Sequence, residues 1–187
     1  MGSLNHVVGF DDGPFVPGHR GDVDLIGAVL SGPRLDGVLR ARVRRDGANA
    51  TDRIAEVIEL SHFRPHLQLV LLQGIAVAGF NVVDIRSLGE RLELPVIAVV
   101  RRRPDLEAIR RALLEKVAGG RRKWRLIEKA GPPTQAAGLW LQCAGIGLEE
   151  ASAAVSRLAI HSRVPEPLRV AHLIAGGISS SGSRQRV

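Results

Sequence analysis

Two adjacent carboxylates, Asp11 and Asp12, follow the apolar run His6–Phe10 and precede Gly13-Pro14. Carboxylate oxygens are the hard, anionic ligands that a divalent cation such as Mg²⁺ needs. The pair could therefore hold a metal ion, or a water molecule bound to a phosphate. The alternative is structural, because Asp, Gly and Pro in succession are typical of a tight turn. The residues alone leave both interpretations open.

Two basic clusters are candidates for binding phosphate. The first directly follows the apolar run Pro95–Val100 and consists of Arg101, Arg102 and Arg103. Ligands of open α/β sheets bind outside the carboxyl ends of the strands, so this cluster lies where a ligand is expected. The second cluster combines one aromatic ring with four cations and consists of Arg121, Arg122, Lys123, Trp124 and Arg125. Its composition is typical of a surface that follows a nucleic-acid strand and stacks a base, and a solvated helix face is the structural alternative.

The overall charge supports a polyanionic partner. The 187 residues include 26 Lys and Arg against 19 Asp and Glu, and 23 of the 26 bases are Arg. The guanidinium group pairs bidentately with phosphate, so this excess favours nucleic acid as the partner. Coding composition, or adaptation of a thermophile protein to heat, explains the same bias, because ion-pair networks gain value at high temperature.

Several other classes of protein lack their signatures here. The chain has no zinc-ligand spacing, no phosphate-binding P-loop and no nucleophile–base motif. Cys143 is the single cysteine, which excludes an intramolecular disulfide and suits a reducing, cytoplasmic location. The longest apolar run is too short to cross a bilayer, so we expect no membrane partner.

The first third of the chain predicts three strands. They span His6–Phe10, Asp22–Ser31 and Gly37–Arg44, and short loops rich in turn residues separate them. Connections this short favour an antiparallel meander.

From residue 51 onward, helical periodicity alternates with short apolar runs. We expect a helix over Thr51–His62, a strand over Leu67–Leu72, a helix capped by Asn81, the strand Pro95–Val100 and a helix that starts at Pro104. Strands of this kind, separated by helices, are typical of parallel crossover units that are covered on both faces.

The last third is less regular. It predicts a basic helix over Arg121–Ala130, a strand over Leu139–Cys143, a helix over Leu148–Ile160 and a last helix from Pro165 to about Ala175. We expect one domain over residues 6–178 and a flexible C-terminal tail over residues 179–187.

This order of elements indicates the fold class. An α/β fold with three antiparallel strands, then parallel strands, and helices on both faces is characteristic of a ribonuclease H-like mixed sheet. Hydrophobic residues make up 45% of the chain but aromatic residues only 3%, so the core must be aliphatic. A fold alone does not assign an activity.

Four motifs add a family resemblance. They are DDGPF at Asp11–Phe15, DGANAT at Asp46–Thr51, GFNVVD at Gly79–Asp84 and PEPLRVAH at Pro165–His172. In the stretches Val8–Asp11, Gln73–Arg101 and Pro165–His172 the chain resembles the endonuclease V superfamily. With the four motifs together it is still more similar to a mainly archaeal branch of that superfamily, domain-of-unknown-function family ninety-nine. The resemblance extends over residues 6–178.

The resemblance implies a nuclease site in which three carboxylates hold Mg²⁺. These carboxylates lie on the first strand, near the start of the first helix and at the end of the fourth strand; here the matching positions are Asp11, Asn49 and Gln73. His172 matches a fourth position in the metal shell, and Arg101 stands where the nucleases carry a Lys.

Two departures from the nucleases bear on activity. Asn49 and Gln73 are amides, so the formal charge of the site falls from −3 to −1, and Mg²⁺ gives up its water reluctantly. The chain also has no Tyr, whereas the lesion-directed nucleases open the duplex with an aromatic wedge after the third strand. The nearby carboxylates that could compensate for the lost charge, none at a matching position, are Asp12, Asp46, Asp52 and Asp84.

We therefore expect a nucleic-acid-binding protein, with RNA or a single strand favoured, that has a depleted Mg²⁺ site and little or no nuclease activity. The candidate catalytic residues are Asp11, Asn49, Gln73 and His172, and the candidate metal ligands are Asp11 and Asp12. An active Mg²⁺-dependent endonuclease on RNA or damaged DNA is one alternative. A structural component of a ribonucleoprotein is another. His172 also falls on the expected buried stripe of the last helix, where a lone histidine is usually a core residue.

Overall fold

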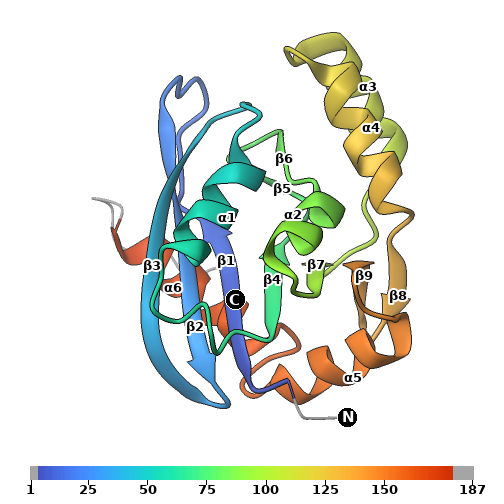
Figure 1. Cartoon of the computed structure of the whole chain (residues 1–187). Helices are drawn as coiled ribbons and strands as arrows, with labels where there is room; N and C mark the ends of the chain where they lie inside the picture. The colour runs from blue at the N-terminus through green and yellow to red at the C-terminus, as the bar shows by residue number, and fades with distance from the viewer. Residues whose placement is uncertain (1–3, 179–187) are drawn as a thin grey trace.

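The computed structural model describes residues 4–178, and its framework is a seven-stranded mixed sheet (Figure 1). The strand order is β3-β2-β1-β4-β7-β9-β8. The strands span β1 His6–Asp12, β2 Asp22–Ser31, β3 Arg34–Arg44, β4 Leu69–Gln73, β7 Val96–Val100, β8 Thr134–Ala136 and β9 Leu139–Ala144. The architecture is the expected ribonuclease H-like one.

The strand pairing brings three carboxyl ends to one edge of the sheet. Strands β1, β2 and β3 form the expected antiparallel meander, and β4 and β7 extend it in parallel from β1. Phe10 lies beside Leu72 in the β1–β4 ladder, and Gln73 lies beside Val99 in the β4–β7 ladder. The ends of β1, β4 and β7 are therefore neighbours.

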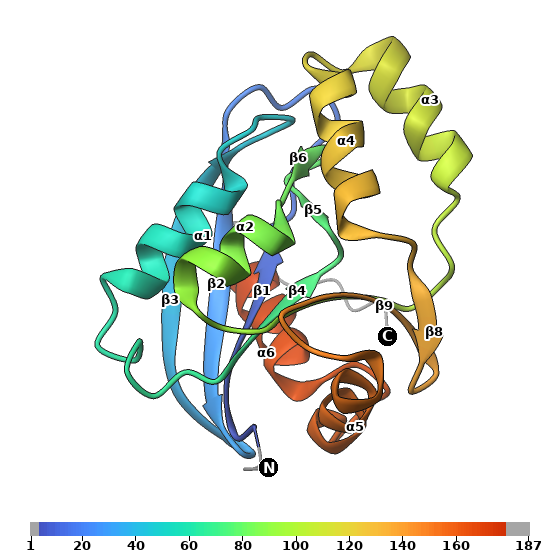
Figure 2. The same ribbon diagram turned by 45° about the vertical axis from the view of Figure 1, so that its right-hand side comes forward.

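Helices cover both faces of the sheet, because successive strand residues point to opposite sides. On one side Val8, Phe10 and Leu72 pack against α1 (Ala50–Glu59) and α2 (Ile85–Leu92). On the other, the apolar side chains pack against α5 (Leu148–Leu158) and α6 (Glu166–Ile178). Figures 1 and 2 show these two helices on that side of the sheet. The buried strand residues of this cluster are Val7, Leu69, Leu71, Ile97, Val99, Leu139 and Leu141.

Helices α3 (Leu106–Lys116) and α4 (Gly120–Ala130) lie side by side beyond the edge of the sheet (Figures 1 and 2). Gly119, with φ +70°, forms the tight turn between them. A small apolar cluster holds the pair to the rest of the molecule. Its buried members are Val82, Leu113 and Ile127.

The expectation that Asn81 caps a helix is wrong. Asn81–Val82 forms β6, which pairs antiparallel with β5 (Ala76–Val77). Three residues connect these strands, and the first two of them, Ala78 and Gly79, have φ angles of +47° and +82°. Consecutive positive φ angles make a tight hairpin turn, which helical periodicity does not reveal. The helix α2 instead begins at Ile85, and its cap is Asp84, whose carboxylate accepts a hydrogen bond from the Ser87 amide at 3.0 Å.

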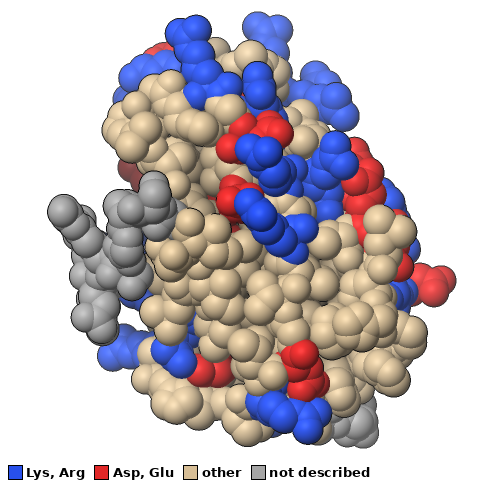
Figure 3. All heavy atoms as spheres, turned by 90° about the vertical axis from the view of Figure 1, so that its left-hand side faces the viewer, with Lys and Arg blue, Asp and Glu red and all other residues tan. Residues whose placement is uncertain are grey.

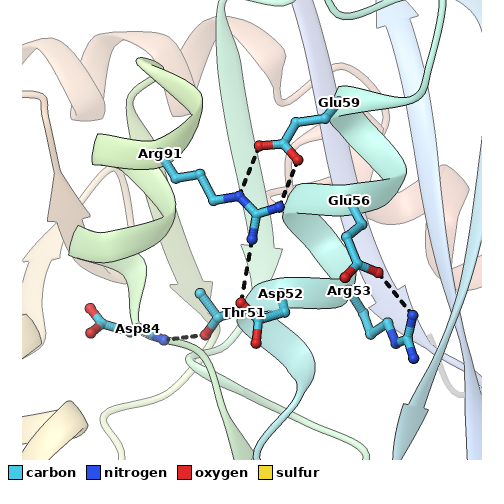
Figure 4. Close-up of polar contacts among 7 residues, drawn as sticks. All are labelled: Thr51, Asp52, Arg53, Glu56, Glu59, Asp84 and Arg91. Carbon is cyan, nitrogen blue, oxygen red and sulfur yellow. Dashed lines mark hydrogen bonds and ion pairs between the residues drawn. The ribbon is translucent and has the colours of Figure 1, made fainter.

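Helices α1 and α2 are joined by polar contacts (Figure 4). Arg91 donates to both carboxylate oxygens of Glu59, at 2.8 and 2.6 Å, and to Asp52 at 3.3 Å. The Asp84 amide donates to the Thr51 hydroxyl at 3.0 Å. Asp52 and Asp84 are therefore engaged in holding these two helices.

The expected tail over residues 179–187 lies outside the described residues, and the 6–178 domain boundary stays a prediction. Within residues 4–178, no helix combines the length and the apolar character needed to cross a membrane.

Candidate functional site

Asp11 lies at the carboxyl end of β1 and is 5% exposed. Its Oδ2 atom accepts a hydrogen bond from Nδ1 of His172, on α6, at 2.7 Å. An ionised carboxylate only accepts hydrogen bonds, so Nδ1 of His172 carries the hydrogen and Nε2 is left for another partner. The His172 side chain is 67% exposed, so the expectation of a core histidine is wrong.

Gly9 explains how α6 reaches Asp11. A Cβ atom at Gly9 would lie 2.5 Å from the carbonyl carbon of Pro167 and 2.7 Å from the Leu168 amide nitrogen, both in α6. Only a glycine allows the helix to approach the strand so closely. From Leu168, which is fully buried, about one helical turn brings the chain to His172, beside Asp11.

The electrostatics of Asp11 are unfavourable without a cation. Burial, followed by the charge of Asp12, raises the pKa of the Asp11 carboxyl from 3.8 to about 6, although His172 acts in the opposite direction. Burial also raises the pKa of Asp12. No Lys or Arg pairs with either carboxylate among residues 4–178.

Asp12 points toward the β5–β6 hairpin. Its Oδ2 atom accepts a hydrogen bond from the Ala78 amide at 2.5 Å, and its own amide donates to Oδ1 of Asp11 at 3.0 Å. Asp12 thus couples the end of β1 to the tip of the hairpin.

Gln73 comes next to Asp11 by register. The β1–β4 ladder pairs Phe10 with Leu72, so one further residue places Asp11 beside Gln73, at a strand spacing of about 4.8 Å. Leu71, two residues earlier, packs on the side of α6, so Gln73 points toward the same face as Asp11. The structure therefore brings Asp11, Gln73 and His172 to one place.

Asn49 has different partners. Its Oδ1 atom accepts hydrogen bonds from the Arg44 amide at 3.1 Å and from Nδ2 of Asn81 at 2.8 Å. These two bonds use both lone pairs of the amide oxygen. The fully buried Asn81 also donates to the Arg44 carbonyl and accepts from the Ala50 amide at the start of α1. Asn49 and Asn81 together connect β3, α1 and the hairpin, and Asn49 has no oxygen lone pair left for a cation.

Asp46 anchors the hairpin and α4. Its Oδ1 atom accepts from the Phe80 amide at 2.8 Å, and its amide donates to the Ala78 carbonyl at 2.9 Å. Lys123, which is 4% exposed, donates to the carbonyl oxygen of Asp46. A continuous series of hydrogen bonds therefore runs from Asp12 through the hairpin to Lys123.

The two basic clusters differ in exposure. The exposed residues are Arg101, Arg102 and Arg103 in the first cluster and Arg121, Arg122 and Arg125 in the second. Lys123 and Trp124 turn inward, and Trp124 packs on the cluster around Ile127. Trp124 is only partly buried there, and its role in stacking a base stays a prediction.

A metal-binding cluster of three or more His, Cys, Asp or Glu side chains does not occur within residues 4–178. The donors at the edge of the sheet are the carboxylate of Asp11, the side-chain amide of Gln73 and the imidazole of His172. Oxygen donors beside a buried carboxylate that has no Lys or Arg partner suit a hard divalent cation.

Some residues at the site escaped the sequence analysis. Gly9 and Asn81 position α6 and α1, yet each is a single small residue inside an apolar stretch. The DG-x-N-AT and GFNVVD motifs contain Asp46, Asn49 and Asn81, and their joint occurrence was the available signal that these segments meet.

The fold is endonuclease V-like. The fold is similar to that of Ciona intestinalis endonuclease V in complex with an inosine-containing 24mer DNA. The TM-score is 0.54 and the identity 18%, covering 90% of this chain and 84% of that one. Human endonuclease V, as its catalytic domain, gives a TM-score of 0.57 at 21% identity, covering 90% and 79%. At these identities the likeness concerns the fold.

The family follows from more similar relatives. A UPF0215 protein of Deinococcus radiodurans is 56% identical over 184 residues, covering 97% of this chain and 94% of that protein. A structure of a protein of unknown function from Archaeoglobus fulgidus has a TM-score of 0.86 at 31% identity, covering 92% and 97%. The sequence model of the family described as Endonuclease dU matches residues 4–179. The chain belongs to this family.

Proposed function

We propose that the chain is an endonuclease that cuts DNA strands containing deoxyuridine and works with a divalent cation at Asp11. The family description supports the substrate, and the endonuclease V-like fold supports strand cleavage. One observation carries the assignment of the site. Asp11 is a buried carboxylate at the carboxyl edge of the sheet, its pKa is raised to about 6, and an exposed histidine is hydrogen-bonded to it.

Asp11 and Gln73 are the proposed ligands of the cation. The carboxylate of Asp11 supplies the charge, and the amide oxygen of Gln73 supplies a neutral donor. When bound, Mg²⁺ or Mn²⁺ activates a water molecule and stabilises the leaving oxygen of a phosphodiester. Asp12 replaces none of the missing carboxylates directly, because its Oδ2 atom holds the Ala78 amide.

His172 is the proposed proton carrier. Its Nδ1 atom is fixed by the hydrogen bond to Asp11, which orients the imidazole ring. The side chain is exposed, so Nε2 can accept a proton from an attacking water or return one to the leaving oxygen.

A nucleic-acid-binding protein with little nuclease activity is the second candidate. The observation that favours it is the engagement of Asn49, whose amide oxygen is fully used by Arg44 and Asn81. Among the three positions that match the carboxylates of the nucleases, Asp11 is then the one that can offer a charged oxygen to a cation. A preference for RNA and a place in a ribonucleoprotein stay predictions under this candidate.

Cleavage of labelled oligonucleotides separates the two candidates. The substrates are strands with one deoxyuridine, with thymidine or inosine at the same place, and an RNA of the same sequence. Each is incubated with Mg²⁺, Mn²⁺ or EDTA. Metal-dependent cutting at deoxyuridine that Asp11→Ala abolishes, while Asp36→Ala on the distant β3 does not, supports the endonuclease. Salt-dependent binding of the strands without any metal-dependent cutting supports the second candidate.

A further inference from the structure

The net charge of the molecule is confined to one segment. Residues 101–130, the basic arm, contain eleven Lys and Arg and four Asp and Glu, a net charge of +7. The rest of the chain contains 15 of each and is neutral. The basic arm comprises the turn after β7 and the helices α3 and α4 beside the sheet (Figure 2).

Basic side chains of the arm are exposed and lack acidic partners. Among residues 4–178, the only ion pair made by an arm residue joins Lys129 to Asp84 at 2.7 Å. The exposed arm bases with no ion pair in this part of the chain are Arg101, Arg102, Arg103, Arg110, Arg111, Lys116, Arg121, Arg122 and Arg125. Unpaired guanidinium groups on a protruding element are available to phosphate.

The β3 side of the molecule is different. Figure 3 shows basic side chains interspersed with acidic ones over the upper part of that face. Arg40 pairs with Asp24 at 2.9 Å, and Arg44 pairs with Asp22 at 3.6 Å. Several basic residues there have acidic neighbours, so the arm holds most of the exposed bases that lack an ion pair among residues 4–178.

We propose that the basic arm grips the phosphate backbone of duplex DNA that flanks the cleaved position. This inference rests on the proposed function, because it assigns the part of the substrate that lies outside the site. A duplex is favoured over a single strand by the placement of Trp124, the aromatic residue of the arm. Its ring is partly buried against the cluster of Leu113 and Ile127, so it offers a base less of the exposed face on which single-strand binding depends.

The arm begins beside the candidate site and is tied back to it. Arg101 directly follows β7, in which Val99 lies beside Gln73. In the first turn of α4, Lys123 donates a hydrogen bond to the Asp46 carbonyl oxygen. Helix α4 has 11 residues and a length of about 16 Å. Duplex DNA carries one charge per about 1.7 Å of axis, so the arm can face roughly five nucleotides of each strand.

Binding measured without cleavage tests the arm. The wild-type chain in EDTA is titrated into a fluorescent 20-base-pair DNA and into a 20-nucleotide single strand over a series of salt concentrations. In the arm variant, Arg111, Arg121 and Arg122 are replaced by Gln. The control variant replaces Arg34, Arg157 and Arg163, exposed bases outside the arm, so both variants lose the same charge.

We expect the arm variant to bind the duplex at least about tenfold more weakly at 0.1 M salt. The slope of log affinity against log salt should fall by about 3, since each lost phosphate contact removes about 0.9. The control variant should keep the slope of the wild type. Equal losses in both variants, or a loss confined to the single strand, would overturn the inference.

Failure of the arm and failure of the proposed function are distinguishable. If the wild type cuts at deoxyuridine and the arm variant still binds duplex DNA normally, the proposed function stands and the role of the arm is wrong. If the wild type cuts no substrate but binds duplex DNA through the arm, the role of the arm stands and the endonuclease proposal is wrong.

Discussion

Nδ1 of His172 lies 2.7 Å from Oδ2 of Asp11, although the two residues are 161 positions apart. The contact depends on two features of the sequence. Gly9 lets α6 approach β1, and the helical spacing from Leu168 brings His172 to the end of the strand. The carboxylate is buried and the imidazole is exposed, so a group that holds charge is joined to one that can exchange protons with solvent.

The first prediction is that Asp11→Asn stabilises the protein at pH 8 and much less at pH 4. The folded-state pKa of Asp11 is raised from 3.8 to about 6, so the folded chain binds this proton more tightly than the unfolded chain does. The penalty is absent below pH 3.8 and develops as the pH rises through 6, up to about 3 kcal/mol. Thermal melting in EDTA from pH 4 to 8 measures it.

Asp36→Asn is the matched control, because Asp36 pairs with Arg34 near the start of β3, at the end of the sheet opposite Asp11. It should show no such gain at high pH. An Asp11→Asn protein that is less stable than the wild type at pH 8 would contradict the prediction and indicate that the ion pair with His172 outweighs burial.

The second prediction is that Gly9→Ala destabilises the protein by about 1–3 kcal/mol, because the added methyl group collides with the backbone of α6 at Pro167 and Leu168. The melting temperature should fall by several degrees. Gly177→Ala, in the same helix, adds a methyl group that meets nothing within 4 Å. It should be neutral or slightly stabilising. Equal melting temperatures for both variants would contradict the close approach of α6.

Much of the fold was predictable from hydrophobic patterning. The alternating residues of Gly37–Arg44 and the apolar run Pro95–Val100 predicted a half-exposed strand and a buried strand, and these are β3 and β7. The expectation that Asn81 caps a helix failed, because the segment from Gly74 to Asn81 leads into the β5–β6 hairpin. The course of this segment depends on positive φ angles at Gly74, Ala78 and Gly79 and on hydrogen bonds that the Ala78 and Phe80 amides donate to distant carboxylates, and periodicity contains neither.

The candidate site was predictable only in part. Motif matches located Asp11, Gln73 and His172, and the structure brings these three together. The hydrogen bond between Asn81 and Asn49 could not be predicted from these motifs, because it depends on how the β5–β6 hairpin packs against α1. The exposure of His172 depends on the exact rotation of α6, which Gly9 sets.

The third prediction concerns the buried amide of Asn81. Asn81→Ala removes hydrogen bonds to the Ala50 amide, the Arg44 carbonyl and Asn49, and should cost about 2–4 kcal/mol. Asn81→Asp keeps the acceptor for Ala50 but sets a buried carboxylate against two oxygen atoms, so it should be at least as destabilising. Urea unfolding measures both. A mild effect of Asn81→Asp would mean that this network is open to water.

The fourth prediction separates Gln73 from Asn49 as a position for binding a cation. Gln73→Glu keeps the size of the side chain and adds a charge next to Asp11, where no Lys or Arg pairs with the carboxylate among residues 4–178. The rise in melting temperature caused by Mn²⁺ should therefore increase, by several degrees for each tenfold gain in affinity.

Asn49→Asp adds the same charge but should raise the response to Mn²⁺ less than Gln73→Glu does, because one oxygen of the new carboxylate still accepts from the Arg44 amide and from Asn81 and only the other is free. Melting with and without Mn²⁺, at pH 7.5 so that Asp11 is ionised, compares the two variants with the wild type. A larger response from Asn49→Asp than from Gln73→Glu would place the cation near the start of α1 instead of between β1 and β4. If neither variant changes the response to Mn²⁺, then a carboxylate added at position 49 or 73 does not help a cation to bind near Asp11.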